Sequence, residues 1–452
     1  MRKNTRSRKE RVFFVSRKYK FQFAGTQSAF QTNAEIPAPF SAMKPEKTKA
    51  PRAFNVMTKP IGALCNLNCT YCYYLEKHGL YAGTKMPRMS DEILERFIQE
   101  YIASQDVPEV QFVWQGGEPS LLGIDFFQKV LALQEKYADG KKIENAFQTN
   151  GTLINEAWAA FLADNRFLVG LSIDGPRELH DARRVTRAGT PSFDLVFAGM
   201  QQLKRFGAEF NTLTVVGDHN VRHAIEVYEF LRESGSGFIQ FIPLVERPAT
   251  ASDAPMRFAG PPDLETGTLG DPLVTPWSVK PNDYGDFLCK IYDVWVRRDV
   301  GQTFVQLFDV ALCAWAGVPA PLCVFREKCG SALALEHNGD VFSCDHFVYP
   351  KYKLGNVQTD SLAKLAALPQ QKKFGELKAS SLPRVCRKCG VRFACHGECP
   401  KHRFLYSPEG EPGLNYFCAA YKKFFSHVGP TMSRMKTLLD QGRAPAEIMK
   451  EL

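Results

Sequence analysis

Beyond residue 52, short runs rich in β-branched and aromatic residues alternate with longer runs whose apolar residues recur at helical spacing. The short runs predict strands at Asn55–Lys59, Val110–Trp114, Asn145–Thr149, Leu168–Ile173, Asn211–Val216 and Phe238–Pro243. The longer runs predict helices at Asp91–Ser104, Phe126–Tyr137, Ala157–Asp164, Phe193–Phe206 and Ala224–Glu233. Six β–α units imply a parallel sheet, so we expect an α/β fold with a partial, TIM-like (β/α)6 barrel. Its active site would lie at the carboxyl ends of the strands.

The composition changes after the sixth strand. Between about Glu246 and Pro281 the chain is rich in Pro, Gly, Ala, Thr and Asp, which is typical of a long loop or lid. A helix is predicted next, at Asp283–Arg298. From Leu322 onward the pattern indicates short, cysteine-rich elements.

A β-hairpin is predicted in this cysteine-rich region, because Asn338-Gly339 lies between the apolar runs Ala332–Glu336 and Val341–Cys344. Helices are expected at Ser361–Lys378 and Ala419–Leu439. We therefore divide the chain into a basic extension (1–52), a barrel (53–245), a loop and helical linker (246–320), a cysteine-rich domain (321–425) and a helical tail (426–452).

The net charge of +9 is concentrated at one end of the chain. Residues 1–52 hold 13 Lys and Arg against 3 acids, so the remainder sums to about −1. We therefore expect no nucleic-acid partner. No run is long enough for a secretory signal or a membrane span, so we expect a soluble cytoplasmic protein without a membrane partner. The extension is interpreted as disordered, or as a misassigned start with Met43 or Met57 as the true beginning.

Thirteen cysteines in a reducing compartment favour metal binding over disulfides. Cys289 and Cys313 are isolated and are interpreted as small buried hydrophobes. The other eleven cysteines fall into groups.

The first group, Cys65-x3-Cys69-x2-Cys72, follows the first predicted strand. Its three thiolates could hold three irons of a cubane cluster and leave the fourth iron open, because no fourth cysteine lies within about two hundred residues. The alternative is a structural zinc site that lacks one ligand. Structural zinc sites are closed by four ligands, and a strand end is where catalysis is expected, so we favour the open cluster.

Polar or Gly-rich motifs also follow the next three strands. They are Gln115-Gly116-Gly117-Glu118-Pro119, Asn150-Gly151 and Ser172-Ile173-Asp174-Gly175. Together with the first cysteine group, they give four consecutive strand ends that carry candidate catalytic or binding residues.

The cysteine triplet followed by Tyr73, with Gly116-Gly117-Glu118-Pro119 after the next strand, resembles the radical S-adenosylmethionine (SAM) superfamily. The resemblance implies that the open iron chelates the methionine part of the cofactor, which yields a 5′-deoxyadenosyl radical after reduction. Glycines let backbone groups approach that methionine closely. The expected cofactor contacts are Tyr73, Gly116, Gly117, Glu118, Asn150, Ser172 and Asp174.

Eight later cysteines form the pattern Cys323-x5-Cys329-x14-Cys344, Cys386-x2-Cys389-x5-Cys395-x3-Cys399 and Cys418. They suffice for two sites of four ligands, and from the residues alone zinc and several pairings stay open. The run resembles the SPASM domain of radical enzymes that modify peptides. That resemblance implies one [4Fe–4S] cluster on Cys323, Cys329, Cys344 and Cys399, and another on Cys386, Cys389, Cys395 and Cys418.

Within this group the chain resembles the anaerobic sulfatase-maturating enzymes from about Val56 to Phe425. The similarity includes Lys59-Pro60-Ile61-Gly62, Cys72-Tyr73-Tyr74-Leu75-Glu76, Gln148-Thr149-Asn150-Gly151 and Cys344-Asp345-His346. It implies oxidation of a Cys or Ser side chain in a nascent or unfolded sulfatase to Cα-formylglycine. It also implies SAM, three [4Fe–4S] clusters, and an electron donor such as flavodoxin or ferredoxin.

The resemblance makes Asp345 the base and brings Tyr74 and Gln115 near the substrate. Each has a plainer alternative: Asp345 as a hydrogen-bonding acid beside a cluster, Tyr74 as a packing residue, Gln115 as a backbone cap. Asp174-Gly175 could likewise be a turn, and His346 is interpreted as structural. The basic residues Arg183, Arg184 and Arg187 are expected at the solvated surface.

Two other functions remain open from the sequence. The nearer is a related peptide maturase that forms thioether or carbon–carbon crosslinks. The more distant is a non-catalytic iron–sulfur or zinc protein.

Overall fold

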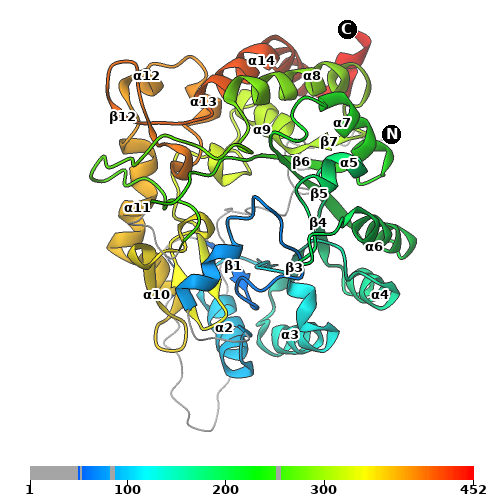
Figure 1. Cartoon of the computed structure of the whole chain (residues 1–452), viewed down its shortest axis with the longest axis vertical. Coiled ribbons are helices and arrows are strands. Elements are labelled where there is room, and N and C mark those ends of the chain that lie inside the picture. Colours follow the sequence, from blue (N-terminus) through cyan, green and yellow to red (C-terminus); the bar gives the residue numbers. More distant parts are fainter. Residues whose placement is uncertain (1–48, 51–52, 82–86, 251–255) are drawn as a thin grey trace.

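The computed structural model describes residues 49–50, 53–81, 87–250 and 256–452 (Figure 1). The predicted basic extension therefore lies almost entirely outside the described residues, as does Met43.

A parallel six-stranded sheet forms the centre of the molecule, as predicted. Its strands are β1 (Asn55–Lys59), β2 (Glu109–Trp114), β3 (Lys142–Thr149), β4 (Leu168–Ser172), β5 (Phe210–Val216) and β6 (Phe238–Pro243). The connecting helices are α2 (Asp91–Ser104), α3 (Ile124–Tyr137), α4 (Glu156–Asp164), α5 (Arg177–Asp181), α6 (Phe193–Arg205) and α7 (Ala224–Glu233). Figure 1 shows α2, α3, α4 and α6 packed around the outside of the curved sheet.

The sheet extends beyond the six predicted strands at both edges. β7 (Phe304–Val305) pairs with β6, and the hairpin of β8 (Ala332–Glu336) and β9 (Asp340–Phe342) lies beyond β1, followed by β10 (Lys353–Asn356). β8 runs parallel to β1 in the register Asn55↔Ala332 to Lys59↔Glu336. One continuous sheet therefore crosses the boundary expected at residue 321, and the ends of β1 and β8 coincide.

The linker helices pack against the end of the chain. α8 (Pro281–Arg298) lies along α14 (Cys418–Asp440), with Tyr284 edge-on to Tyr421 and the Tyr292 hydroxyl 2.5 Å from that of Thr431. α9 (Gln306–Trp315) follows β7. Cys289 and Cys313 are buried in the apolar core that these helices share with the barrel, as expected.

The cysteine-rich region consists of short elements. They are α10 (Leu362–Ala367), α11 (Pro369–Ser380), α12 (Arg384–Arg387), α13 (Arg392–Cys395), β11 (Leu405–Tyr406), β12 (Pro412–Leu414) and the 3-10 turns η4 (Cys323–Phe325), η5 (Asp345–Phe347), η6 (Pro350–Tyr352) and η7 (Pro400–His402). Three further 3-10 segments are η1 (Leu75–Tyr81), η2 (Pro119–Leu122) and η8 (Pro445–Lys450).

The single helix predicted at Ser361–Lys378 is wrong. The chain forms two helices that meet at Leu368, whose ψ of 140° is extended. The cause is Pro369, because the proline ring disfavours the helical conformation of the residue before it.

None of the described helices combines the length and apolar character needed to cross a membrane.

Candidate active site at the carboxyl ends of the strands

The first cysteine group lies on the loop that leaves the carboxyl end of β1. Cys65, Cys69 and Cys72 are unpaired and lie close enough for their charges to interact. Burial raises the pKa of Cys65 and of Cys69 to about 12, so these thiols stay protonated unless a cation replaces the proton. Three dehydrated thiols on one loop form a donor set that fits a cluster with one open iron.

The glycine motif after β2 packs directly on this cysteine loop. A Cβ at Gly117 would lie 1.8 Å from the carbonyl oxygen of Leu64, so only glycine fits there. The Gly117 amide donates to the Gly62 carbonyl (2.7 Å), and the Glu118 amide donates to that of Leu64 (2.8 Å). The glycines therefore have a chain-packing role that the motif alone did not reveal.

Glu118 connects the ends of β2 and β3. Its buried carboxylate accepts hydrogen bonds from the Ser120 amide (3.0 Å), the Thr149 hydroxyl (2.8 Å) and the Asn150 amide (2.7 Å). Burial outweighs these bonds and raises the pKa of Glu118. Within the described structure the Glu118 carboxylate therefore contacts residues that follow β2 and that end or follow β3.

Asn150 connects β3 to the cysteine loop. Its Nδ2 donates to Asn66 Oδ1 (2.8 Å) and lies 3.6 Å from Cys65 Sγ. On the next strand, Ser172 Oγ accepts a hydrogen bond from Gln148 Nε2 (3.1 Å). Asn150 and Ser172, which are both predicted to contact the cofactor, therefore lie at the carboxyl ends of the neighbouring strands β3 and β4.

Asp174 anchors the cysteine loop from the end of β4. Its fully buried Oδ2 accepts from the Tyr71 hydroxyl (2.6 Å), which lies between Cys69 and Cys72, and from Arg184 Nε (3.0 Å). Its Oδ1 accepts from the Val215 amide on β5 (2.9 Å). Burial opposes ionisation of Asp174, but Arg184 outweighs it and holds the pKa well below its usual value.

The expectation that all three arginines lie at the solvated surface is wrong for Arg184. It is buried because it neutralises Asp174. Arg183 is partly exposed and pairs with Asp218, and Arg187 is exposed, with its Nε donating to the Cys65 carbonyl (2.7 Å).

Asp345 lies at the opposite side of the cysteine loop. Its Oδ1 is 2.5 Å from Lys59 Nζ, and its Oδ2 accepts a hydrogen bond from the Tyr73 hydroxyl (2.8 Å). Burial opposes ionisation, but Lys59 outweighs it, with His346 and the hydrogen bonds from Lys59 and Tyr73, so the pKa of Asp345 is below its usual value. The side chain is therefore a carboxylate at neutral pH.

Lys59 lies among the predicted site residues, although the sequence interpretation gave it no role. It ends β1 and is 1% exposed, and its Nζ is 3.2 Å from Gln115 Oε1 and 4.3 Å from the centre of the Tyr74 ring. Asp345, Gln115 and Tyr74 thus meet at one ammonium. A lysine at the end of the first strand of a parallel sheet was the available signal, because a buried lysine needs a partner.

Tyr74 also connects the loop after β1 to β8. Its buried hydroxyl donates to Glu336, the last residue of β8. His346 lies on the other flank of Asp345, with Nδ1 3.3 Å from Cys399 Sγ.

The eight later cysteines form two groups in space. Charge interactions connect Cys323, Cys329, Cys344 and Cys399 with one another, and a separate set connects Cys386, Cys389, Cys395 and Cys418. All eight are unpaired. No group of His, Cys, Asp or Glu in the described part of the chain is arranged to hold a single metal ion.

Two buried cations accompany these cysteines. Lys378 Nζ donates to the carbonyls of Cys323 (2.7 Å) and Val324 (2.8 Å). The guanidinium of Arg403 donates to four backbone carbonyls and is close to Cys329, Cys399 and Cys386, which belong to both groups. Two four-thiolate clusters would bring negative charge here, so the donor set and its surroundings fit them.

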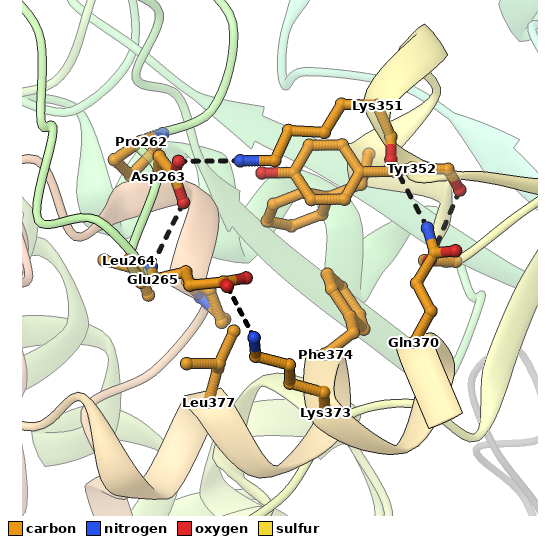
Figure 2. Close-up of a pocket in the computed structure, with 13 residues that line it drawn as sticks. Pro262, Asp263, Leu264, Glu265, Lys351, Tyr352, Gln370, Lys373, Phe374 and Leu377 are labelled. Atoms are coloured by element: carbon orange, nitrogen blue, oxygen red, sulfur yellow. Dashed lines mark hydrogen bonds and ion pairs between the residues drawn. The ribbon is translucent and has the colours of Figure 1, made fainter. Parts of the chain in front are cut away.

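A cavity of about 300 Å³ lies outside the predicted site (Figure 2). The ion pairs Asp263–Lys351 and Glu265–Lys373 hold the long loop after β6 against η6 and α11 at its edge. Its lining residues are Pro262, Asp263, Leu264, Glu265, Ser343, Phe347, Lys351, Tyr352, Gln370, Lys373, Phe374, Leu377 and Pro400. None of the predicted site residues is among them.

Replacing Arg184 with Met should destabilise the protein by about 3 kcal/mol or more, because it leaves the Asp174 carboxylate buried without its counter-ion. The control is Arg183→Met, which removes an ion pair of partly exposed side chains and should cost about 1 kcal/mol or less. Thermal unfolding followed by circular dichroism checks both. Equal midpoints for the two variants would contradict the assignment of Arg184 as a buried partner.

Comparison with known proteins gives matches over most of the chain. Residues 60–231 match the model of the radical SAM superfamily, and residues 323–390 match that of an iron–sulfur cluster-binding domain. The serine-type anaerobic sulfatase-maturating enzyme of Bacteroides thetaiotaomicron is 47% identical over 88% of this chain and 94% of its own length. The cysteine-type enzyme of Clostridium perfringens is 33% identical over 84% of this chain and 97% of its own length. The solved structure of native anSMEcpe with bound AdoMet and Cp18Cys peptide superposes with a TM-score of 0.73 at 31% identity, over 85% of this chain and 98% of that one.

Proposed function

The chain belongs to the anaerobic sulfatase-maturating enzymes of the radical SAM superfamily, and we propose that its site oxidises a Cys or Ser side chain in a sulfatase polypeptide to Cα-formylglycine. The observation that carries this proposal is the position of Asp345. It is hydrogen-bonded to Tyr73, the neighbour of Cys72, and it directly follows Cys344. The site for hydrogen abstraction, the proton acceptor and an electron acceptor would thus adjoin one another.

We assign the cluster ligands as the groups of cysteines indicate. Cys65, Cys69 and Cys72 would hold a [4Fe–4S] cluster with one open iron, and the two later groups would each hold a fully ligated one. With S-adenosylmethionine bound there, the open cluster would supply the radical chemistry that removes a hydrogen atom from the substrate Cβ. Gly116, Gly117, Asn150, Ser172 and Asp174 shape the surroundings of that cofactor.

Asp345 would accept the thiol or hydroxyl proton. A carboxylate with a lowered pKa is a weak base, so proton transfer must accompany loss of the second electron from the substrate radical. In total the substrate loses one hydrogen atom, one proton and one electron. Ser thereby becomes the aldehyde, whereas Cys becomes a thioaldehyde that water then hydrolyses to the aldehyde. A thiol, with a pKa of about 8.5, yields its proton more easily than an alcohol, so Cys should be the easier substrate.

Lys59 would act as a positioning residue. Its ammonium holds one Asp345 oxygen, which leaves the other toward Tyr73, and it also orients Gln115 toward the substrate side. The arrangement fixes the carboxylate before the substrate arrives, and preorganisation of this kind lowers the barrier.

The reaction needs a polypeptide and a source of electrons. We place it in the cytoplasm, where unpaired cysteines persist. A low-potential carrier of the flavodoxin or ferredoxin class would reduce the open cluster before each cleavage of the cofactor.

The metal content tests the ligand assignment. Anaerobically reconstituted protein should contain about twelve irons and twelve sulfides per chain, and Cys386→Ala with Cys389→Ala should lose about four of each. Cys313→Ala, which removes an isolated buried cysteine, should lose none. Zinc on the eight later cysteines would contradict the assignment.

The function itself is tested with reduced enzyme, SAM and peptides of the form Cys/Ser-x-Pro/Ala-x-Arg. The wild type should yield 5′-deoxyadenosine and the peptide aldehyde in step, and Asp345→Asn should still cleave the cofactor but lose most of the aldehyde, by roughly a hundredfold or more. Asp263→Asn, which alters an acid on the long loop, should behave as the wild type. Deoxyadenosine without aldehyde from the wild type would reject formylglycine formation, and unchanged product from Asp345→Asn would reject this base.

Replacing Lys59 with Met should lower the yield of aldehyde per deoxyadenosine at least about tenfold, because Asp345 loses the contact that orients it. Lys77→Met is the matched control. Lys77 is equally buried and its Nζ is 3.5 Å from Glu76 Oε1, but it does not contact Asp345. If both variants keep the wild-type ratio, Lys59 has only a structural role.

A further inference from the structure

The cavity of Figure 2 shares a wall with the predicted site. Ser343 and Phe347 line the cavity, and the segment between them is Cys344-Asp345-His346, which carries the proposed base. Asp345 begins the turn η5 and Phe347 ends it. One short turn of the chain therefore contributes Asp345 to the reaction site and Phe347 to the cavity.

The interior of the cavity is apolar and largely aromatic. Phe347, Tyr352 and Phe374 pack edge to face, with ring centres 4.9, 5.0 and 6.0 Å apart. Leu264, Leu377 and two prolines complete the apolar lining. The volume of about 300 Å³ is at the lower limit of small-molecule sites. An aliphatic or aromatic side chain that entered the cavity would therefore be buried among carbon atoms.

The charged residues at the edge of the cavity already have partners. Figure 2 shows the ion pairs Asp263–Lys351 and Glu265–Lys373, which bridge the long loop to η6 and α11. A site for a polar metabolite presents a few polar groups that orient the ligand, whereas these four charges are engaged with one another. Both lysines are exposed, so the edge borders solvent. The chemistry favours an apolar group that enters from outside.

The loop that walls the cavity is attached to the segment after the first cysteine group. The Glu76 carboxylate on η1 accepts hydrogen bonds from the amides of Arg257 and Phe258 (2.8 Å each). Further along the loop, Arg247 Nη1 donates to the Leu269 carbonyl (2.6 Å). These bonds hold the loop on both sides of Pro262–Glu265, so the cavity keeps a fixed position beside the site.

We propose that the cavity binds an apolar side chain of the sulfatase polypeptide, a leucine or an aromatic residue within about six residues of the Cys or Ser that is oxidised. An extended chain advances about 3.3 Å per residue, so a few residues carry a polypeptide held at Asp345 around the turn η5. The inference rests on the proposed function, because that function supplies the polypeptide. Such side chains are exposed in a nascent or unfolded chain and buried in a folded one, so the cavity selects the substrate before it folds.

The test measures binding without turnover. Reconstituted holoenzyme with SAM and no reductant is titrated into fluorescein-labelled peptides of about seventeen residues, and anisotropy gives the Kd. A central Cys-x-Pro-x-Arg motif is flanked by Ser and Gly, and a single leucine is moved through the flanking positions on each side. The wild type should bind the peptide with leucine at one position, or at two adjacent ones, about tenfold or more tightly than the leucine-free peptide.

The variant Leu264→Trp fills the cavity from the loop. It should leave the leucine and leucine-free peptides within about twofold of each other, because the apolar side chain no longer enters. Leu273→Trp is the matched control, because Leu273 is on the same loop, is 62% exposed and does not line the cavity. This variant should keep the full gain from leucine. Phe374→Ala covers the case in which Leu264→Trp fails to fold, and it should lose at least about threefold of the gain.

The proposed function is measured separately, as deoxyadenosine and aldehyde formed from a five-residue motif peptide that does not extend to the cavity. Leu264→Trp should match the wild type in that assay, so failure of the cavity inference and failure of the proposed function are distinguishable.

A wild-type affinity that does not depend on the leucine would overturn the inference. So would a gain from leucine that both Leu264→Trp and Phe374→Ala keep, because the leucine would then bind elsewhere. If all peptides bound alike but Leu264→Trp weakened binding of the dye 1-anilinonaphthalene-8-sulfonate, the cavity would take a small apolar molecule and the proposal would be wrong.

Discussion

The parallel pairing of β8 with β1 is the constraint on which the site depends. It sets the end of the cysteine-rich hairpin beside the end of the first barrel strand, with Glu336 opposite Lys59. The loop after β1 carries the open cysteine group, and the turn after β9 carries Cys344 and Asp345. Lys59 and Asp345 are almost three hundred residues apart in the sequence. They form an ion pair because β1 and β8 are neighbours in one sheet.

Buried charge is balanced locally throughout this region. Asp345 faces Lys59, and Asp174 faces Arg184, while Arg403 is surrounded by carbonyls between the two later cysteine groups. A buried charge without a partner would cost several kcal/mol, so each pair fixes the orientation of both members. The pairs around the first cysteine loop hold it from both sides, through Tyr71 to Asp174 and through Tyr73 to Asp345. These two hydrogen bonds connect the loop to the end of β4 and to the turn after β9.

Much of this arrangement could be predicted from the sequence, and the omissions share a physical cause. The six strands and most helices followed from local periodicity, and the strand-end position of Gln115, Asn150 and Asp174 followed from the parallel sheet. Lys59 and Arg184 were not identified as site residues, because burial of a basic side chain depends on which distant acid meets it. The pairing of β8 with β1 was missed for the same reason, since nothing local specifies the neighbour of an edge strand. The break at Pro369 was a local signal that the helical periodicity around it obscured.

The central claim is that hydrogen abstraction from the substrate Cβ is coupled to proton transfer at Asp345. The most direct measurement uses a sulfatase-motif peptide with both Cβ hydrogens of its target residue replaced by deuterium. We predict one deuterium in each 5′-deoxyadenosine and one retained in the aldehyde, with the Asp345→Asn variant still transferring deuterium to the cofactor fragment but releasing little aldehyde. Deoxyadenosine free of deuterium, formed while aldehyde accumulates, would contradict this account.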